Sequence, residues 1–500
     1  MVENGEEPKA LVTGVSTRCM HTKPMDLLQM VMRLIKTHFK IDSPALPEGA
    51  AEVLSHGCIF SWLELGAGEG PIVLGLDLDG FQDPPGGGQL AHQIEAASMS
   101  WLTSAQPTGS NLIITTAQPS AVATVKDRYH WPIIVMEPMK KNDVTNLVLL
   151  YLGRRGLEFV GKSREKMSLF RDEDVSNALF LTTLLHDWRM LDHVGWKHDK
   201  HVDKLLLTNT VAPSKCLSHL VGSMIDRWEQ DYQIGARQVF GDLLCFLVVA
   251  RAGVTEEDLL GLVKADPSAL GAFLTTAREM FATKTGVYHI KHHVVQNIVI
   301  HKYMSNTVDV EGVRAVIIDY FTDMGLDKER AALELTYQFQ EAGRKADLLE
   351  TIKSLGVFNT FFSSGLESEI VGYWGTFDAD SRMIAEVYDK ALRSLEAAGA
   401  EGMTTIDQRK VYGISLDNYE SMARLLSHLG RFLSRTGQNL AGIDILKRLV
   451  AVHERINPGS AHVASISLRV AQQYWKIGYY AEGLPFADSA LKLYTNLYGH

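Results

Sequence analysis

A repeat of 41 residues near the end of the sequence constrains the fold of this chain more than any other feature. In each copy, a stretch with helical spacing of apolar residues is followed by a glycine turn and a second helical stretch. The matched pairs are Ala423 with Ala464, Leu429 with Val470, Leu433 with Tyr474, Gly437 with Gly478, and Gly442 with Gly483. Such a unit cannot bury its apolar face alone, so repeated units must stack. The repeat predicts stacked helix pairs over residues 401–500.

The order helix, glycine turn, helix is the tetratricopeptide layout with a lengthened repeat. Two unrelated helical hairpins are the alternative, which the matched positions disfavour. Residues 344–361 and 380–396 are interpreted as degenerate earlier units, although they do not keep the 41-residue spacing. The last repeat has no polar capping helix, so we expect that the sequence is cut at this end.

Apolar runs near the N-terminus indicate a different architecture. Strands are predicted at residues 9–15, 71–77, 111–116 and 131–136, with a helix over 24–39 and a glycine turn at 66–70. Continuously apolar strands separated by helices are typical of a parallel sheet covered on both faces. Residues 1–160 are therefore predicted to form an α/β domain.

Helical periodicity dominates after residue 142. Two or three amphipathic helices are expected within residues 171–230. Residues 231–304 show the order helix, helix, helix, strand, helix, with the third helix over residues 268–281. Thr255 and Asp258 have the spacing of an acidic capping box, which predicts a helix start there. This order suggests a winged-helix module at 231–320, but a basic recognition helix is missing, so a DNA-binding role is disfavoured.

Composition excludes several classes of function. The chain has 59 acidic and 49 basic residues, a formal charge of −10, so nucleic acid is not expected as a partner. Its longest apolar stretch, residues 243–250, is far shorter than the ~20 residues of a membrane helix, and no signal peptide is recognisable. We expect a cytoplasmic protein without membrane insertion. The four cysteines contain no Cys-x-x-Cys, which favours reduced thiols.

The strand predicted at 71–77 runs into acidic residues. An aspartate at the carboxyl end of a parallel strand lies where open α/β folds bind ligands. In P-loop nucleoside triphosphatases that residue is the Walker B aspartate, which holds Mg²⁺ against phosphates. The alternative is a strand-ending aspartate that only caps a turn.

Residues 156–163 match Gly-x₄-Gly-Lys-Ser literally. A functional phosphate loop needs a buried strand before it and a helix after it. The preceding segment, residues 144–152, is compatible with a helix or a strand, and the loop carries the bulky residues Leu157 and Phe159. A chance match is favoured.

Histidines cluster at His186, His193, His198 and His201. His198 and His201 are three residues apart and could share a helix face, so a metal-dependent hydrolase is one alternative. No thiolate or glutamate stands at a typical ligand spacing, and a solvated helix is favoured. No nucleophile elbow is recognisable.

Several segments, taken in order, resemble the NACHT nucleotide-switch proteins of the STAND class, and especially nephrocystin-type proteins with tetratricopeptide repeats after the NACHT region. The matching stretches are residues 12–15 with the helix at 27–34, 72–83, 111–116, 178–185, 227–232, 250–260 and 290–303. Each motif is weak alone, and their order is specific.

The resemblance implies a nucleotide site that takes ATP or GTP with Mg²⁺. By position, Asp79 is the catalytic, magnesium-organising acid, Thr115 or Thr116 faces the terminal phosphate, and His292 senses the diphosphate form. The second acid of the family falls on Gln82, with Asp83 next to it, and Asp77 is an alternative first acid. The phosphate loop of the family would lie upstream of Met1, so the α/β core is expected to be incomplete, impaired in hydrolysis and marginally stable.

These inferences give a domain plan with two functional readings. The plan is an incomplete NACHT-like core at 1–160, a helical subdomain at 161–230, a winged-helix module at 231–320, a helical linker at 321–400 and repeats at 401–500. One reading is a regulatory nucleotide switch whose repeats hold protein partners. The alternative is a non-enzymatic tetratricopeptide scaffold with a vestigial nucleotide core. Self-association and a ciliary or signalling role are implied by the resemblance alone.

Overall fold

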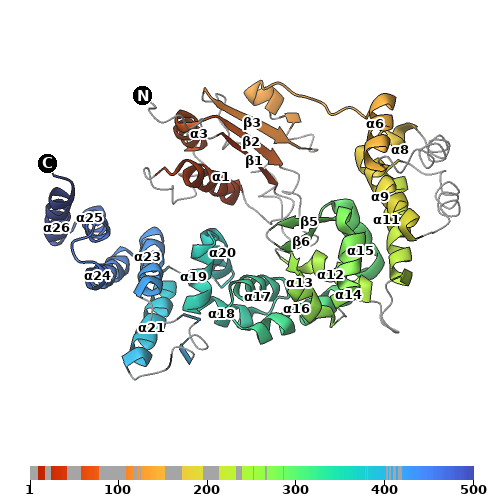
Figure 1. Cartoon of the computed structure of the whole chain (residues 1–500). Coiled ribbons are helices and arrows are strands. Elements are labelled where there is room, and N and C mark those ends of the chain that lie inside the picture. The colour runs from red at the N-terminus through yellow and green to blue at the C-terminus, as the bar shows by residue number, and fades with distance from the viewer. Residues whose placement is uncertain are drawn as a thin grey trace. The chain divides into compact units, whose positions relative to one another are not determined.

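In its described residues the computed structural model is mostly helical, with two small sheets (Figure 1). It describes residues 10–16, 24–41, 58–77, 108–116, 122–123, 125–152, 172–194, 213–231, 239–251, 253–264, 267–284, 286–377, 379, 381–400, 404, 407–408, 413–414 and 419–499. The chain divides into two compact units, one made of residues 1–131 together with 321–500 and the other of residues 132–320. The predicted domain boundaries stay predictions.

A parallel sheet of three strands forms within residues 1–131. The strands are β1 (Leu11–Ser16), β2 (Ile72–Asp77) and β3 (Ser110–Thr115), in the order β1-β2-β3. Leu11 lies opposite Ile72, and Ile72 lies opposite Ser110. The first three predicted strands are confirmed to within two residues at each end.

Two helices cover one face of this sheet. They are α1 (Pro24–Phe39), whose predicted bounds are confirmed, and α3 (Cys58–Glu69). The buried core between these helices and the strands consists of Leu11, Leu28, Val31, Met32, Ile35, Ile59, Trp62, Leu63, Ile72, Leu74 and Leu76. On the opposite face Val12 and Ile113 are exposed. Among the described residues the sheet is therefore covered on one face, whereas the sequence predicts two covered faces.

The sequence predicts a glycine turn at residues 66–70, but most of this segment is helical. Helix α3 continues through Gly66 and Gly68 to Glu69. A Cβ atom on Gly66 would lie 2.7 Å from the side chains of both Ile35 and Ile72. Glycine at this position thus permits close packing of α3 against α1 and β2.

The predicted strand at residues 131–136 is also wrong. These residues follow a short π-helix, η3 (Val125–Tyr129), and have no regular secondary structure up to helix α6 (Lys141–Leu152). Ile134 is 86% exposed and Met136 is 89% exposed. An apolar β-branched run satisfies the strand pattern, but a strand also needs a neighbour with which to pair its backbone. No described strand pairs with this run.

The unit from Pro132 to Tyr320 is built from helices and a small antiparallel sheet. Its further elements are α8 (Asp172–Val175), α9 (Ala178–Val194), α11 (Pro213–Asp231), α12 (Val239–Val249), β4 (Val254–Thr255), α13 (Glu256–Val263), α14 (Pro267–Thr276), η5 (Arg278–Met280), β5 (Phe281–Lys284), β6 (Val287–Ile290) and α15 (His293–Tyr303). The sheet order is β4-β6-β5. The predicted helix at 268–281 ends earlier, because residues 278–284 form η5 and β5.

The predicted cap of α13 is confirmed. The Thr255 side chain accepts a hydrogen bond from the Asp258 backbone N–H, and the Asp258 carboxylate accepts one from the Thr255 N–H, at 3.1 and 2.9 Å. This reciprocal pair satisfies two backbone donors at the start of the helix.

Helix pairs continue from residue 307 to the end of the described chain. The helices before the repeat are α16 (Thr307–Met324), α17 (Glu329–Glu341), α18 (Lys345–Ile352), α19 (Leu355–Ser363), α20 (Glu367–Gly375) and α21 (Ser381–Ala400). The fully buried Phe358 lies with its ring centroid 4.7 Å from that of Tyr388 and 5.5 Å from that of Phe432. Aromatic contacts of this kind connect α19 and α21 to the first helix of the repeat.

The 41-residue repeat forms two helix pairs. The first pair is α23 (Tyr419–Arg435) with α24 (Asn439–Ile456), and the second is α25 (Ala461–Lys476) with α26 (Tyr480–Tyr498). The turn glycines Gly437 and Gly478 both have φ of +81°, in the left-handed region. The predicted order of helix, glycine turn and helix is confirmed in both copies.

Candidate functional site

The carboxyl ends of the three parallel strands bring polar residues into one row. Ser16 lies opposite Asp77, and Asp77 lies opposite Thr115, each as the last residue of its strand. Asp77 is the last residue of β2. This strand lies between β1 and β3 (Figure 1). This carboxyl edge is where ligands bind in open parallel α/β sheets.

The predicted nucleotide-site residues have different outcomes at this edge. The register brings Asp77 and Thr115 onto neighbouring strands, and Thr115 is exposed while Thr116 is half-buried. Asp79 and Asp83 lie outside the described residues. Ser16 was missed by the sequence interpretation, although it ends its apolar run as Asp77 does.

His292 lies in the other compact unit, at the start of α15. It is the N-cap residue, with an extended backbone (φ −129°), and its side chain does not cap the helix. It lines an open pocket with about 370 Å³ of empty space. The other lining residues are Leu179, Thr183, His186, Leu217, Val221, Met224, Glu279, Met280, Val294 and Val295.

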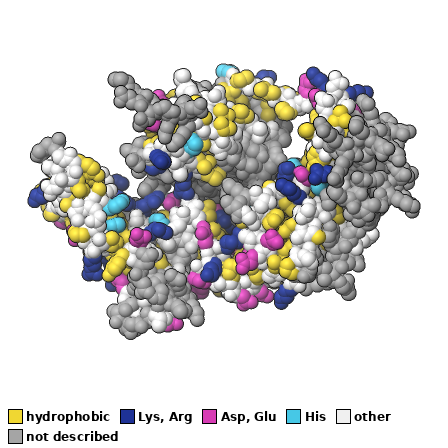
Figure 2. Space-filling model, in the orientation of Figure 1, with side chains coloured by type: hydrophobic (Ala, Val, Ile, Leu, Met, Phe, Trp, Pro, Cys, Tyr) yellow, Lys and Arg dark blue, Asp and Glu magenta, His cyan; other side chains and the backbone are white. Residues whose placement is uncertain are grey.

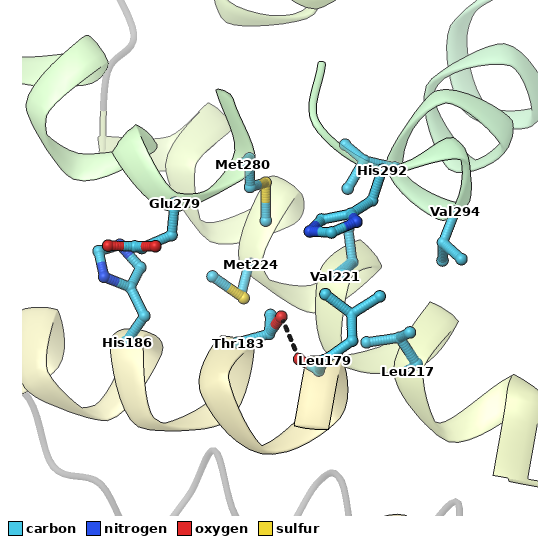
Figure 3. Close-up of a pocket in the computed structure, with 11 residues that line it drawn as sticks. Leu179, Thr183, His186, Leu217, Val221, Met224, Glu279, Met280, His292 and Val294 are labelled. Atoms are coloured by element: carbon cyan, nitrogen blue, oxygen red, sulfur yellow. Dashed lines mark hydrogen bonds between the residues drawn. The ribbon is translucent and has the colours of Figure 1, made fainter. Parts of the chain in front are cut away.

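The pocket is mainly apolar, and its polar groups have partners within the protein. Figure 3 shows His292 together with Met224 and Met280 around the same space. Thr183 donates a hydrogen bond to the Leu179 carbonyl at 2.7 Å. The ring Nε2 of His186 is 2.8 Å from the Thr276 carbonyl oxygen, so this nitrogen carries a proton.

Glu279 interacts with Tyr151 of helix α6. Burial raises the pKa of Tyr151, and the nearby carboxylate of Glu279 raises it further. The phenol therefore stays protonated near neutral pH and can donate a hydrogen bond to that carboxylate.

Helix α11 connects the pocket helices through charged groups that the sequence interpretation missed. Arg227 pairs with Asp187 of α9, and both side chains are buried. Two residues further on, Glu229 accepts hydrogen bonds from Lys302 and Tyr303 of α15, the former at 2.7 Å. A buried pair that loses one partner leaves an uncompensated charge, so these contacts fix α9, α11 and α15 to one another. Charged residues directly beside the core residue Trp228 were the available sequence signal.

The literal phosphate-loop motif has the wrong context. The segment before it is helix α6, which ends at Leu152, and not a strand. Residues 156–163 themselves lie outside the described residues. The interpretation of a chance match is therefore favoured further.

Metal and nucleophile chemistry gain no support in the described part of the chain. It contains no group of three or more His, Cys, Asp or Glu side chains placed to hold a metal ion. His186 is buried on the Thr276 carbonyl, and His198 and His201 lie outside the described residues. Burial raises the pKa of the Cys245 thiol to about 12, so this cysteine is not a ready nucleophile.

No helix among the described residues combines the length and apolar character needed to cross a bilayer.

Comparison with known proteins identifies relatives over most of the chain. No family model matches the sequence. The sequence is 24% identical to Nephrocystin-3 of Xenopus laevis over 75% of this chain and 28% of that protein, and 24% identical to Nephrocystin-3 of Homo sapiens over 76% and 27%. A TPR repeat-containing protein of Dictyostelium discoideum is 20% identical over 56% of this chain. The chain thus spans a little over a quarter of the length of its nephrocystin-3 relatives.

One solved structure aligns with this chain with a TM-score of 0.46 and 12% sequence identity. The alignment covers 98% of this chain and 72% of the chain in that structure. The structure is that of a Signal Transduction ATPase with Numerous Domains (STAND) protein with a tetratricopeptide repeat sensor from Pyrococcus horikoshii. The sequence relatives confirm the resemblance that the ordered motifs predict: the chain is related to the tetratricopeptide-containing nephrocystin-3 proteins over three quarters of its length.

Proposed function

We propose that this chain is part of a regulatory nucleotide switch of the STAND and NACHT type, in which a nucleotide bound to the α/β core controls a repeat array that holds protein partners. The observation that carries the proposal is the row of Ser16, Asp77 and Thr115 at the carboxyl edge of the parallel sheet. Three neighbouring strands each end there in an oxygen-bearing residue. Relatedness to nephrocystin-3 supports the pairing of such a core with repeats.

The donor chemistry of this edge fits a magnesium nucleotide. Mg²⁺ prefers oxygen ligands and is usually held by one or two carboxylates together with phosphates and water. Asp77 ends the central strand, and Asp79 follows two residues later. In the proposal these aspartates hold the ion, and Thr115 or Thr116 contacts the terminal phosphate. The bound nucleotide would be ATP or GTP.

Residues 239–303 are proposed to be the winged-helix module of the switch. Helices α12, α13 and α14 precede the β5–β6 hairpin, and β4 pairs with β6 on its other side. His292 stands directly before α15, where the helix dipole favours an anion. In the proposal His292 responds to the phosphates, and the contacts of α11 transmit that response to α9 and α15.

Equilibrium binding of a fluorescent ATP analogue to the full chain, with and without Mg²⁺, tests the proposal. Asp77→Asn and Asp79→Asn keep the side-chain volume and remove one charge each. We expect magnesium-dependent binding to weaken by about tenfold or more in at least one of them, which corresponds to ~1.4 kcal/mol. The matched control is Asp172→Asn, which removes the charge of an exposed aspartate on α8.

The outcomes separate the candidate sites. If Lys162→Ala abolishes nucleotide binding while Asp77→Asn and Asp79→Asn have no effect, the nucleotide binds at residues 156–163. That result would contradict the proposal. Competition by unlabelled ATP and GTP then determines which nucleotide binds.

The second candidate function is a non-enzymatic scaffold with a vestigial core. It is favoured by the exposed apolar run that includes Ile134 and by the exposure of Ile113 on β3, the outer strand of the described sheet. A core of this kind would show no saturable nucleotide binding in any variant and no rise in melting temperature with Mg²⁺-ATP. That result would leave the repeat array as the functional part.

A further inference from the structure

Three exposed aromatic side chains gather where α25 ends and α26 begins. Trp475 is 70% exposed, Tyr479 48% and Tyr480 59%, and we name these three residues the aromatic patch. The rings of Trp475 and Tyr480 meet edge to face, with centroids 5.0 Å apart. Hydrophobic side chains are visible on the surface over α25 and α26 (Figure 2). Exposed tryptophan and tyrosine are the residue types that dominate binding energy at protein interfaces.

The repeat itself supplies an internal comparison for the patch. Forty-one residues earlier, the equivalent positions in the first helix pair are Ser434, Gln438 and Asn439. The turn has the same conformation in both copies, because both turn glycines have φ of +81° and the residues after them, Gln438 and Tyr479, have φ of −84° and −90°. Since the first copy folds with polar residues at all three positions, the fold does not require aromatic side chains there.

The other exposed apolar residues of α26 have a different explanation. Leu484 is 59% exposed, whereas its equivalent in the first copy, Ile443, is 1% exposed. Ile443 lies on α24, which packs against the following helix α25. Leu484 is exposed because α26 is the last described helix. The equivalent first-copy residues of the patch are half-buried, so the same explanation covers part of the exposure of the patch, but it does not explain why these positions are aromatic in the second copy and polar in the first.

The repeat is more basic than the chain as a whole. Residues 419–499 contain nine Lys and Arg against five Asp and Glu, in a chain whose total is −10. Two of the nine, Arg431 and Arg448, pair with Glu367 and with Asp389 and Glu396 outside this range, which leaves a surplus of two positive charges. Lys476 is exposed next to Trp475, and the equivalent residue of the first copy, Arg435, is also basic. Arg424 is exposed on α23. A lysine at a helix end can be explained by the helix dipole alone, but the surplus over both pairs favours a negatively charged partner.

We propose that the aromatic patch of α25 and α26 binds an acidic peptide segment of a partner protein through a large apolar residue of that segment. The apolar residue packs on Trp475 and Tyr480, and acidic residues beside it face Lys476 and the other basic groups of the repeat. This inference rests on the proposed partner-holding role of the array and names the chemistry of the partner. It does not require that the core bind nucleotide.

A random peptide library displayed on phage and selected on the full-length chain tests the proposal. The test variant is Trp475→Ser, Tyr479→Gln and Tyr480→Asn together, because the first copy carries these residues at the same positions and folds with them. The control is Leu440→Ala, which removes an exposed leucine of α24 and introduces the residue of the second copy, Ala481. Circular dichroism and thermal melting of each variant verify folding.

We expect the unmodified chain and Leu440→Ala to enrich peptides that combine Asp or Glu with a bulky apolar residue, and the triple variant to lose them. For the most enriched peptide, fluorescence anisotropy should show about tenfold or weaker binding to the triple variant, and weaker binding at higher salt. Replacing its acidic residues by Asn and Gln should have a similar effect.

Three results would overturn the proposal: no enrichment above the triple variant, enrichment of neutral or basic peptides, or equal binding to the chain and the triple variant. A fourth contradicting result would come from analytical sedimentation. If the chain forms dimers that the triple variant does not form, and no acidic peptide is selected, the occupant is a second copy and the proposal is wrong. Each readout is made without nucleotide, so a failed nucleotide-binding experiment leaves it unaffected.

Discussion

The parallel sheet and the repeat array bury their apolar residues in different ways. In the sheet, strands that are far apart in sequence must pair, and among the described residues Val12 and Ile113 remain exposed on its uncovered face. In the array, each helix packs mainly on helices close to it in sequence, such as α23 on α24 and α25 on α26. Stability that depends on near neighbours survives the loss of a distant element, whereas a sheet loses both pairing and cover when one element is missing.

The largest expected effect is a difference in protection between these two regions. In the full chain we expect backbone amides of β1 and β3 to exchange with solvent orders of magnitude faster than interior amides of α23 and α25, because the outer strands open locally. Hydrogen exchange read out by mass spectrometry measures this difference, and limited proteolysis should cut residues 1–160 before residues 401–500. Equal protection and equal cutting would remove the contrast.

Truncating a buried side chain in the helical array tests whether the stability of the array is independent of the sheet. Phe358 is fully buried, and its ring centroid lies 4.4 Å from that of Phe362 and 4.7 Å from that of Tyr388. Phe358→Ala should lower the free energy of unfolding of α19, α21 and α23 by ~3–5 kcal/mol. Protection of the sheet amides should not change. The control is Val308→Ala on α16, where the side chain is exposed. A loss below ~1 kcal/mol would show that the aromatic cluster is loosely packed.

The sheet region has its own packing test at Gly66. A Cβ atom there would lie 2.7 Å from side chains of both α1 and β2, so Gly66→Ala must move one of them. Overpacking of this kind costs ~1–3 kcal/mol, less than Phe358→Ala. Gly68→Ala is the matched control in the same helix, because its added Cβ would meet no heavy atom within 4 Å. Thermal melting should show a lower first transition for Gly66→Ala alone. An equal effect of the two variants would mean that loss of glycine flexibility, and not the contact, decides the outcome.

The sequence predicted the elements whose signal is local. Helix α1 has an apolar stripe and begins at Pro24, and both of its ends are predicted correctly. The 41-residue repeat predicted both helix pairs, because it fixes spacing, turn glycines and apolar positions at once. The helix predicted over residues 268–281 ends at Thr276, and Phe281 begins β5, because this strand is decided by its pairing with β6 and not by local apolar spacing.

The candidate site was predictable where strand ends define it. Asp77 and Thr115 meet because each ends a parallel strand, and this follows from the apolar runs. The contacts of α11 were not predictable, because Arg227 and Asp187 are 40 residues apart and neither residue type indicates a partner. Gly66 shows the remaining difficulty: glycine is typical both of turns and of close helix packing, and only the neighbours distinguish them.

The smallest expected effect concerns pH and is confined to the array. Burial, followed by the nearby charge of Arg431, lowers the pKa of His428 from 6.5 to about 4, although Glu367 has the opposite effect. His428 Nδ1 lies 3.0 Å from the Asn359 side-chain oxygen, and its ring packs beside Phe362. The unfolded chain thus binds a proton near pH 6.5, which the folded array binds only near pH 4.

The sign of the pH dependence follows from that difference. Above pH 6.5 histidine is neutral in both states, and the stability of the array is at its maximum for this group. Between pH 6.5 and about 4 the unfolded state binds more protons, so stability decreases as pH falls. Partial exposure of the ring keeps the effect small.

Exchange protection of α23 measured from pH 7 downward should decrease less in His428→Gln than in the unmodified chain, because glutamine does not titrate and can keep a hydrogen bond to Asn359. His453, whose pKa is also lowered by burial, titrates in both proteins, so the difference between them isolates His428. Identical pH profiles would show that the His428 ring is hydrated in the folded array, and the contrast between the two regions would then not extend to proton binding.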